Sequence, residues 1–562
     1  MADLARRLAV ARGDERADVV IRGGRVLSVF TREWLDVDVA VADGWIAGLG
    51  EYDGEEVVDA SGRYVVPGFV DAHLHLESSK LLPDEFARLV LPLGTTAVVA
   101  DPHEIANVLG TDGVHWLLDA SADIPLDVYF MASSSVPASD YESPRRALSE
   151  GDLEALLRRR RVLGIAEMMN FPGVVSGDTA ELAKLALATH VDGHAPGVRG
   201  RDLQAYAAAG IRSDHEASTL DEGRERLRAG MWLLIREASA ARNLRTLLPL
   251  VAEYGPARMA FCTADREPEH IAEDGHINAI VRDAVAFGIA PEDALVMASQ
   301  HAAQYHRLDH LGAIAPGRQA DLLLLADLER FVPELVLKRG RPVVEIPEST
   351  VPDWVRHTVR IGALGPEVFR IPWSGGAARV IGLVPGQIIT DALVDEPATR
   401  GGEAIADPER DLAKIAVIER HLGTGRVGLG FVRGFGLRRG ALGSTLSHDA
   451  HNAVVVGVDD TSMAFAVRRL ANLGGGIVVV DGGQLLAELP LPVAGIVSDA
   501  PLAEVVAASE AVVAAARELG CELQAPFQSL SFLALSVIPA LKITDRGLVD
   551  VERFELVPLH AE

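Results

Sequence analysis

Residues 65–79, VVPGFVDAHLHLESS, contain an apolar strand that ends in two histidines separated by one residue. Side chains two apart on a strand project from the same face, so His73 and His75 point in one direction. Imidazole pairs of this kind suit a transition metal. An H-x-H pair alone is weak evidence, because many such pairs only hydrogen-bond at a surface. Its position after a Pro-Gly-apolar-Asp strand predicts a metal site.

The segment downstream of this pair, roughly residues 67–310, alternates short apolar stretches with longer helix-compatible ones. Strand–helix alternation of this length predicts a parallel sheet, and about eight repeats predict a (β/α)8 barrel, whose reactive side chains lie at the carboxyl ends of the strands. The strand candidates are TTAVVADPH, LDVYFMASSS, RVLGIAEMM, THVDGH, GIRSDHE, WLLIREAS and ARMAFCTAD.

The two flanks of the barrel segment share a strand-rich, glycine-punctuated character. Residues 1–66 predict a short N-terminal helix and the first part of a small β domain, and residues 311–348 predict its second part. EIPESTVPDWVRHT is typical of a linker or a domain edge. Residues 349–562 again alternate strands with helices and predict a C-terminal α/β domain.

Three further residues join the histidine pair as candidate metal ligands. Glu167 closes the strand GIAE, His194 lies in DGHAPG and His215 lies in SDHE. Singly, such residues are more often structural, but together at the ends of separate strands they predict two cations bridged by a carboxylate. This donor set favours manganese or iron over a thiolate-type zinc site.

The chemistry of such a site is hydrolytic. Two cations lower the pKa of a shared water enough to supply hydroxide, and an acid must protonate the leaving nitrogen. The sequence has no nucleophile elbow and no P-C-x-x-C stretch of the zinc-type base deaminases, so the barrel residues must carry the reaction.

Composition limits the partners. Hydrophobic residues make up 49% and charged residues 24%, as in soluble globular proteins, and the formal net charge is -27. That charge disfavours nucleic acid and anionic membranes as partners, while a neutral base remains acceptable. Only two cysteines are present, and we found neither a secretory signal nor an apolar stretch of membrane-spanning length, so we expect a cytoplasmic protein.

Several other polar residues are secondary candidates for substrate binding or accessory roles. His276, in EDGHIN, is expected on a loop over the site. The others have an equally plausible structural reading as part of a buried pair or a turn network. The full set of secondary candidates is Glu77, His103, Glu104, His276, His448, Asp449 and His451.

Long blocks of the sequence resemble bacterial adenine deaminases, among them TTAVVADPHEIANVLG, IAEMMNFPGVVSG, STLSHDAHNAVVVG and LSFLALSVIPALKITDRGLVD. The resemblance covers nearly the whole chain. It implies hydrolysis of adenine to hypoxanthine and ammonia at a site with two divalent cations, manganese first and iron or zinc as alternatives. It also implies a homodimer, His73, His75, His194 and His215 as ligands, and Glu167 in the bridging position that a carbamylated lysine fills in many related enzymes.

One departure from the family pattern concerns the last barrel strand. Family members carry Cys-Thr-Asp-Asp there, whereas this chain has Cys262, Thr263, Ala264 and Asp265. The methyl group of Ala264 neither binds metal nor accepts a proton, although its position is that of the family's catalytic aspartate. Because adjacent strand residues face opposite ways, Asp265 can replace it only after a local change of the backbone. Without that change we expect impaired activity.

Two other readings stay open at this point. One is a ring-opening cyclic amidohydrolase of the dihydroorotase or hydantoinase type, although a bridging lysine is usual there and Glu167 argues against it. The other is a non-catalytic purine-binding protein, which Ala264 alone supports.

Overall fold

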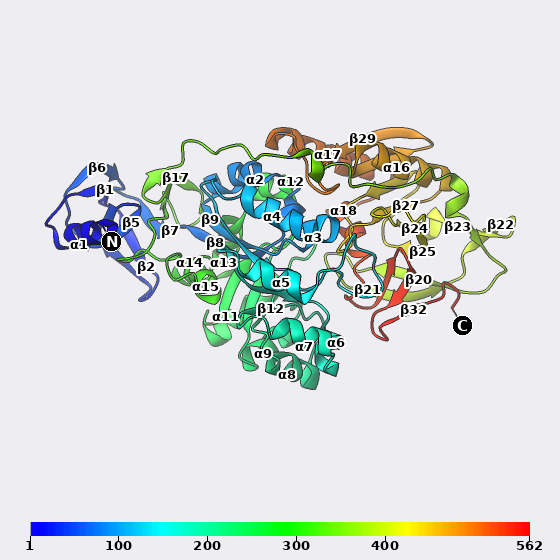
Figure 1. Ribbon diagram of the computed structural model, residues 1–562, viewed down its shortest axis with the longest axis horizontal. Helices are drawn as coiled ribbons and strands as arrows, with labels where there is room; N and C mark the ends of the chain where they lie inside the picture. Colours follow the sequence, from blue (N-terminus) through cyan, green and yellow to red (C-terminus); the bar gives the residue numbers. More distant parts are fainter. Residues whose placement is uncertain (1, 562) are drawn as a thin grey trace.

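The computed structural model describes residues 2–561, and its centre is a barrel of parallel strands (Figure 1). Five strands form one curved sheet in the order β12-β11-β10-β9-β8, and three form a second sheet in the order β13-β14-β15. The strands are β8 (Phe69–Leu74), β9 (Thr95–Ala100), β10 (Asp127–Ala132), β11 (Val162–Met168), β12 (Val191–Gly193), β13 (Ser213–Asp214), β14 (Trp232–Arg236) and β15 (Met259–Cys262).

Backbone hydrogen bonds join the two sheets at both seams. At one seam the Arg212 amide donates to the Val191 carbonyl; at the other the Ala264 amide donates to the His73 carbonyl and the His75 amide to the Ala264 carbonyl. The eight parallel strands therefore close into the barrel that the sequence predicts. Every residue of β8 and β9 is buried, as expected for strands covered by helices.

Helices follow the barrel strands and cover their outer surface. They include α2 (Pro83–Val90), α3 (His103–Leu109), α4 (Thr111–Ala120), α5 (Glu150–Leu157), α6 (Phe171–Ser176), α7 (Thr179–Leu185), α8 (Gly200–Ala208), α9 (Leu220–Arg228), α10 (Leu244–Leu247), α11 (Pro249–Tyr254), α12 (Pro268–Asp274), α13 (Ile277–Phe287), α14 (Pro291–Met297) and α15 (Gln300–Tyr305).

A small β domain is assembled from both flanks of the barrel segment. After the N-terminal helix α1 (Ala2–Arg12), strands before residue 68 combine with strands after residue 321 in one six-stranded sheet, ordered β18-β17-β16-β7-β2-β3. Its members are β2 (Arg25–Ser28), β3 (Glu33–Asp36), β7 (Tyr64–Pro67), β16 (Leu322–Leu325), β17 (Pro333–Lys338) and β18 (Arg341–Pro342). A four-stranded sheet completes it with β1 (Ala17–Arg22), β4 (Asp38–Ala42), β5 (Trp45–Gly50) and β6 (Gly54–Asp59).

Residues 343–352 contain neither helix nor strand and lead from the small β domain past the barrel to the C-terminal domain (Figure 1). The Trp116 indole donates to the Thr350 carbonyl at 3.0 Å and the Arg88 guanidinium to the Ile346 carbonyl at 2.8 Å, so this connection is held against the barrel helices. The stretch EIPESTVPDWVRHT, which predicts a linker or a domain edge, begins in this connection.

The C-terminal domain is built on an eight-stranded sheet ordered β21-β20-β25-β24-β27-β26-β28-β29. Its strands are β20 (Ala378–Leu383), β21 (Thr390–Asp395), β24 (Leu412–Ile418), β25 (Val427–Arg433), β26 (Ala441–Ser444), β27 (Ala453–Gly457), β28 (Gly476–Asp481) and β29 (Gln484–Pro490). The only parallel pair in this sheet is β20 with β25, so the alternation of strands and helices seen in the sequence corresponds here to a mainly antiparallel sheet.

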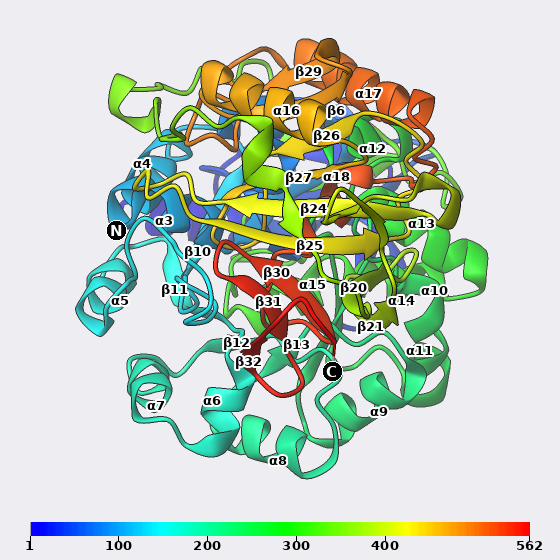
Figure 2. The same cartoon turned by 90° about the vertical axis from the view of Figure 1, so that its right-hand side faces the viewer.

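Helices α16 (Asp460–Leu473) and α17 (Leu502–Glu518) pack on this sheet, and α18 (Pro526–Phe532) contacts β26 and β27 (Figure 2). A small three-stranded sheet, β30 (Leu541–Thr544), β31 (Gly547–Asp550) and β32 (Glu555–Val557), ends the chain. Shorter strands β19 (Ile371–Pro372), β22 (Ala398–Arg400) and β23 (Glu403–Ile405) form a further sheet. Across residues 2–561, we see no helix with the length and apolarity that a membrane crossing requires.

Candidate metal centre

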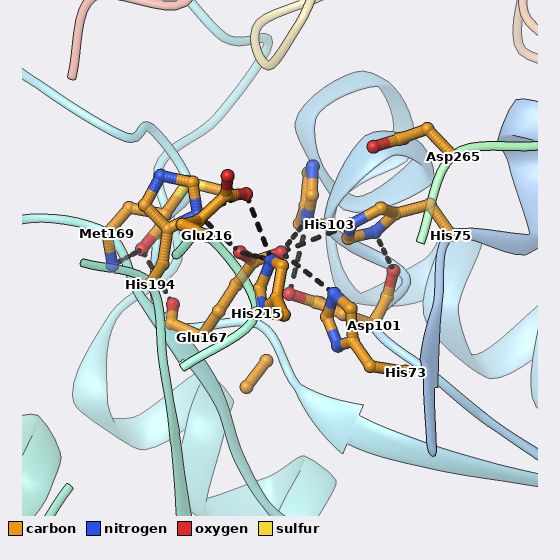
Figure 3. A network of polar contacts seen from close by, with 12 residues as sticks. His73, His75, Asp101, His103, Glu167, Met169, His194, His215, Glu216 and Asp265 are labelled. Carbon is orange, nitrogen blue, oxygen red and sulfur yellow. Dashed lines mark hydrogen bonds and ion pairs between the residues drawn. The ribbon is translucent and has the colours of Figure 1, made fainter. Parts of the chain in front are cut away.

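The candidate ligands predicted from the sequence gather around one carboxylate, that of Glu167 at the end of β11 (Figure 3). His75 Nε2 lies 3.2 Å and His73 Nε2 3.7 Å from Glu167 Oε1. His194 Nδ1 lies 2.8 Å and His215 Nε2 3.3 Å from Glu167 Oε2. Each oxygen of Glu167 thus faces its own pair of histidines, which is the arrangement that a carboxylate bridging two cations requires. We call these five residues the core cluster.

The donor atoms of the core cluster fit divalent metals. All five side chains are almost fully buried, yet His73 Nε2, His194 Nε2 and Glu167 Oε1 have no hydrogen-bond partner. Buried polar atoms are rarely left unpaired, because each unpaired group costs free energy. Imidazole nitrogens and a carboxylate oxygen are ligands of manganese, iron and zinc, so cations would satisfy these atoms.

The pKa shifts within the core cluster bear on its ability to bind cations. Burial, with His215 nearby, holds the pKa of His73 well below its ordinary value, so this ring is neutral and able to bind metal. Burial opposes ionisation of Glu167, but the surrounding histidines, first His215, hold the pKa of its carboxyl well below the usual range. Burial also disfavours charge on His75, yet Asp265 and Glu167 raise the pKa of that ring to about 10, so a cation must displace a proton there.

Three residues around the core cluster were not singled out from the sequence. Glu216 Oε1 lies 3.4 Å from His194 Nδ1 and 3.2 Å from His215 Nε2, and Arg236 binds both oxygens of Glu216 at 2.6 and 2.7 Å. Burial opposes charge on Glu216, but Arg236 and the histidines lower the pKa of its carboxyl to about 2. Asp101, after β9, accepts at 3.2 Å from His103 Nδ1. The sequence signal that could have identified these three residues is their position, because each lies at or just after the end of a strand.

The backbone turns sharply at Ala264. Its φ of 50° lies in the left-handed region, which is unfavourable for alanine. This is the local change that Asp265 needs in order to face the core cluster, and Figure 3 shows its carboxylate beside the His75 ring. Ser78 Oγ donates to Asp265 Oδ1 at 2.8 Å and holds the carboxylate in place. Ala264 itself contributes main-chain hydrogen bonds to the strand that carries His73 and His75.

The secondary candidates fall into two groups, and most of them lie next to the core cluster. His103 Nδ1 lies 3.7 Å from Glu167 Oε1, and its Nε2 lies 3.3 Å from Asp449 of the C-terminal domain. The buried carboxylate of Glu104 accepts from Ser78 Oγ at 2.9 Å. Glu77 Oε1 accepts from the Ile105 amide at 3.1 Å at the start of α3.

His448, Asp449 and His451 come from the connection between β26 and β27 and reach the barrel. His448 Nε2 lies 3.7 Å from Asp265 Oδ1, and its Nδ1 lies 3.6 Å from Glu104 Oε1. His451 Nε2 lies 3.9 Å from Glu104 Oε2. The C-terminal domain therefore covers the carboxyl end of the barrel, and all three residues are buried.

His276 is the exception. The expectation that it lies on a loop over the site is wrong: Thr95 Oγ1 lies 2.8 Å from its Nδ1, and Asp71 Oδ2 lies 3.4 Å from its Nε2. Thr95 begins β9, so this contact lies at the end of that strand opposite to Asp101. Burial lowers the pKa of His276 to about 3, as expected for a neutral ring within a hydrogen-bonded network.

A small cavity lies between the barrel and the C-terminal domain, next to Asp265. Its volume available to water-sized molecules is about 20 Å³, and it is partly open to solvent. Its lining residues are Ser78, Lys80, Glu267, Leu446, His448, Phe527, Gln528 and Ser531. Gln528 Nε2 donates to the Asp265 carbonyl at 2.9 Å, which fixes the amide, while the buried Gln528 Oε1 has no partner. The cavity therefore has two buried acceptors without a partner on its lining residues, Gln528 Oε1 and Glu267 Oε2, within a mixed apolar and polar wall.

Comparison with known families agrees with this architecture. Residues 64–343 match the model described as the amidohydrolase family, and residues 387–555 match the model of the adenine deaminase C-terminal domain. The barrel with its buried histidines and glutamate thus defines a hydrolase of the amidohydrolase class, whose members use divalent metals.

Relatives that match nearly the full length of the chain identify its family within this class. The chain is 46% identical to adenine deaminase 2 of Carboxydothermus hydrogenoformans, covering 98% of both chains. It is 48% identical to the adenine deaminase of Methylobacterium sp. strain 4-46, covering 99% of this chain and all of the relative, and 46% identical to that of Archaeoglobus fulgidus, covering 100% and 98%. The chain belongs to the adenine deaminase family. A solved enamidase structure is more distant, with 18% identity and a TM-score of 0.44 over 59% of this chain and 97% of the enamidase.

Proposed function

We propose that this protein hydrolyses adenine to hypoxanthine and ammonia. The observation that carries the proposal is the position of Asp265, a carboxylate held by Ser78 beside a cluster of metal donors and next to a cavity. In the reaction the bond between C6 and the amino nitrogen breaks, a bond between C6 and a water oxygen forms, and the protons of water end on the product and on ammonia.

Two divalent cations would be held by His73, His75, His194, His215 and Glu167. Manganese is our first choice because a bridging carboxylate favours the harder first-row ions. Such ions supply a hydroxide nucleophile near neutral pH by lowering the pKa of water. Glu216, fixed by Arg236, faces the same ring nitrogens of His194 and His215 as Glu167 does, so its carboxylate would be a further donor to a cation there.

The chain's own residues then move protons and orient the base. Asp265 would take the proton from the attacking water and deliver it to the leaving nitrogen. Gln528 Oε1 would accept a hydrogen bond from a ring N–H of the purine, because its Nε2 is already engaged by the Asp265 carbonyl. Phe527 and Leu446 would contact the ring faces. Asp265 in this role makes the chain active, despite the methyl group of Ala264.

The finer assignments belong to the same proposal. Both cysteines are free and buried, which supports a reducing cytoplasm. The homodimer implied by the resemblance stays a prediction, for which analytical ultracentrifugation gives the mass in solution.

The test is ammonia release by the manganese-reconstituted protein. We expect turnover of adenine and at least ~100-fold lower kcat/KM for adenosine, because the ribosylated ring nitrogen cannot donate a hydrogen bond and an unpaired buried acceptor is costly. Absence of ammonia release from adenine, with two metal equivalents bound, would contradict the proposal.

A further inference from the structure

A second group of possible metal donors lies where the C-terminal domain meets the barrel. We call Glu104, His448, Asp449 and His451 the interdomain cluster. Glu104 stands in the first turn of α3, on the barrel side, whereas the other three stand between β26 and β27 of the C-terminal sheet. None of these side chains is more than 5% exposed, so the cluster is closed to bulk water.

Distances within the interdomain cluster are too long for hydrogen bonds. His448 Nδ1 lies 3.6 Å from Glu104 Oε1 and 3.5 Å from Asp449 Oδ1, and His451 Nε2 lies 3.9 Å from Glu104 Oε2. A hydrogen bond between such atoms has a length of about 2.7–3.2 Å. Two ligands of one cation, each at about 2.1 Å, stand roughly 3.0–3.5 Å apart, so small movements would place these atoms around a metal ion.

The unpaired atoms of the interdomain cluster point to the same conclusion. Glu104 Oε2, His451 Nε2 and both carboxylate oxygens of Asp449 are buried without a hydrogen-bond partner. Asp449 Oδ1 faces His103 Nε2 at 3.3 Å, while the other three atoms are left unpaired in one buried place, which is unfavourable. A cation would accept the lone pairs of Glu104 and Asp449. His451 Nδ1 accepts from the Ser447 amide at 3.2 Å, so coordination through Nε2 moves the ring proton to Nδ1 and breaks that hydrogen bond.

Neighbouring residues hold the donors in place. The His448 ring stacks on Phe532 with centroids 4.5 Å apart, its amide donates to Ser531 Oγ at 2.9 Å, and Glu104 Oε1 accepts from Ser78 at 2.9 Å. The donor atoms therefore meet with little freedom of rotation, which lowers the entropy lost on binding.

We propose that the interdomain cluster binds a further divalent cation, separate from the core cluster, with Glu104, His448 and His451 as ligands and Asp449 as an additional acceptor. Two imidazole nitrogens and carboxylate oxygens suit manganese, iron or zinc. Because the ligands come from both sides of the interface, the ion would fasten the C-terminal domain to the barrel.

Metal stoichiometry tests the proposal. The chelated full-length protein is reconstituted with Mn²⁺, dialysed, and analysed by mass spectrometry for metal per chain. The His451→Gln variant is expected to bind one equivalent less than the unchanged protein. The control His301→Gln removes a buried histidine that belongs to neither cluster and whose Nδ1 lies 2.9 Å from the Met259 carbonyl, and it should bind as many ions as the unchanged protein.

Two further measurements separate this site from the core cluster. The His73→Gln variant should lose metal from the core cluster and keep the interdomain ion. The double variant, with both His73→Gln and His451→Gln, should therefore bind less metal than either single variant. Crystals of the unchanged Mn²⁺ protein should show an anomalous peak between Glu104 and His451, a result that does not depend on any variant folding. Equal metal content in the unchanged protein and His451→Gln, or a water in place of that peak, overturns the proposal.

Discussion

Asp265→Asn is the substitution that most directly examines the proposed proton transfer. Asparagine has nearly the same shape and can still accept the hydrogen bond from Ser78, 2.8 Å away, so the fold should lose little stability. The amide cannot take up a proton, and the carboxylate of Glu167 is a poor substitute. The histidines around Glu167 hold the pKa of its carboxyl well below the usual range, and a weak base accepts protons poorly.

The expected loss follows from this comparison. Positioned acid–base groups contribute about 10²–10⁴-fold, equivalent to about 2.7–5.5 kcal/mol of transition-state free energy. Because Glu167 compensates poorly, we expect kcat to fall about 10³-fold with KM within about threefold of the unchanged value. The assay follows adenine absorbance and ammonia at saturating substrate, with metal content and melting temperature measured on the same samples.

Two comparisons make the result decisive. Asp192 is another buried carboxylate; it accepts a hydrogen bond from the Tyr305 hydroxyl, and burial raises its pKa to about 7. The control Asp192→Asn should leave kcat within about threefold of the unchanged value. Ala264→Asp should bring no gain, since Asp265 already supplies the carboxylate. Asp265 is not the proton carrier if Asp265→Asn, fully loaded with metal, retains more than a tenth of kcat, or if Ala264→Asp raises kcat tenfold or more.

Other consequences concern the substrate, the metals and the pH dependence of stability. Gln528→Ala should raise KM for adenine about tenfold while changing kcat less, because one hydrogen bond to the base is lost; an unchanged KM in steady-state kinetics would place the base elsewhere. Chelation should abolish ammonia release, and added Mn²⁺ should restore it in proportion to the ions bound at the core cluster; activity that persists in metal-free protein would exclude hydrolysis by these donors. Burial lowers the pKa of Lys542 from 10.5 to about 7, so between these values the folded chain binds fewer protons than the unfolded chain, and stability rises with pH. Lys542→Met should reduce the rise of unfolding free energy with pH by up to about 1.4 kcal/mol per pH unit. Urea unfolding at pH 7 and pH 9.5 measures this rise, and the same rise in both proteins would count against the low pKa of Lys542.

The barrel and the core cluster were predictable because their signals are local. A strand of period two fixes the common direction of His73 and His75, and a parallel barrel brings the carboxyl ends of its strands together. Glu167, His194 and His215 follow from that rule without any knowledge of the loops.

The remainder depends on features with no local signature. The left-handed backbone of Ala264 is set by hydrogen bonds to β8, a strand far away in the sequence, so alternation along one strand could not place Asp265. Gln528 belongs to a helix of the C-terminal domain, and only domain packing brings it to the barrel. His276 was wrongly expected over the site because it is a polar residue near a turn. It is instead part of a buried hydrogen-bond network with Thr95.

The covering of the barrel by the C-terminal domain has a consequence for the dielectric environment of the reaction. A polypeptide ending near residue 343 would retain every member of the core cluster but lose His448, Asp449, His451 and Gln528. Water would then replace protein above Asp265. The attraction between the Asp265 charge and the His75 ring would become several-fold weaker, because water has a higher dielectric constant than a protein interior. Such a shortened enzyme would still hold cations, yet its proton-transferring carboxylate would behave like one free in solution.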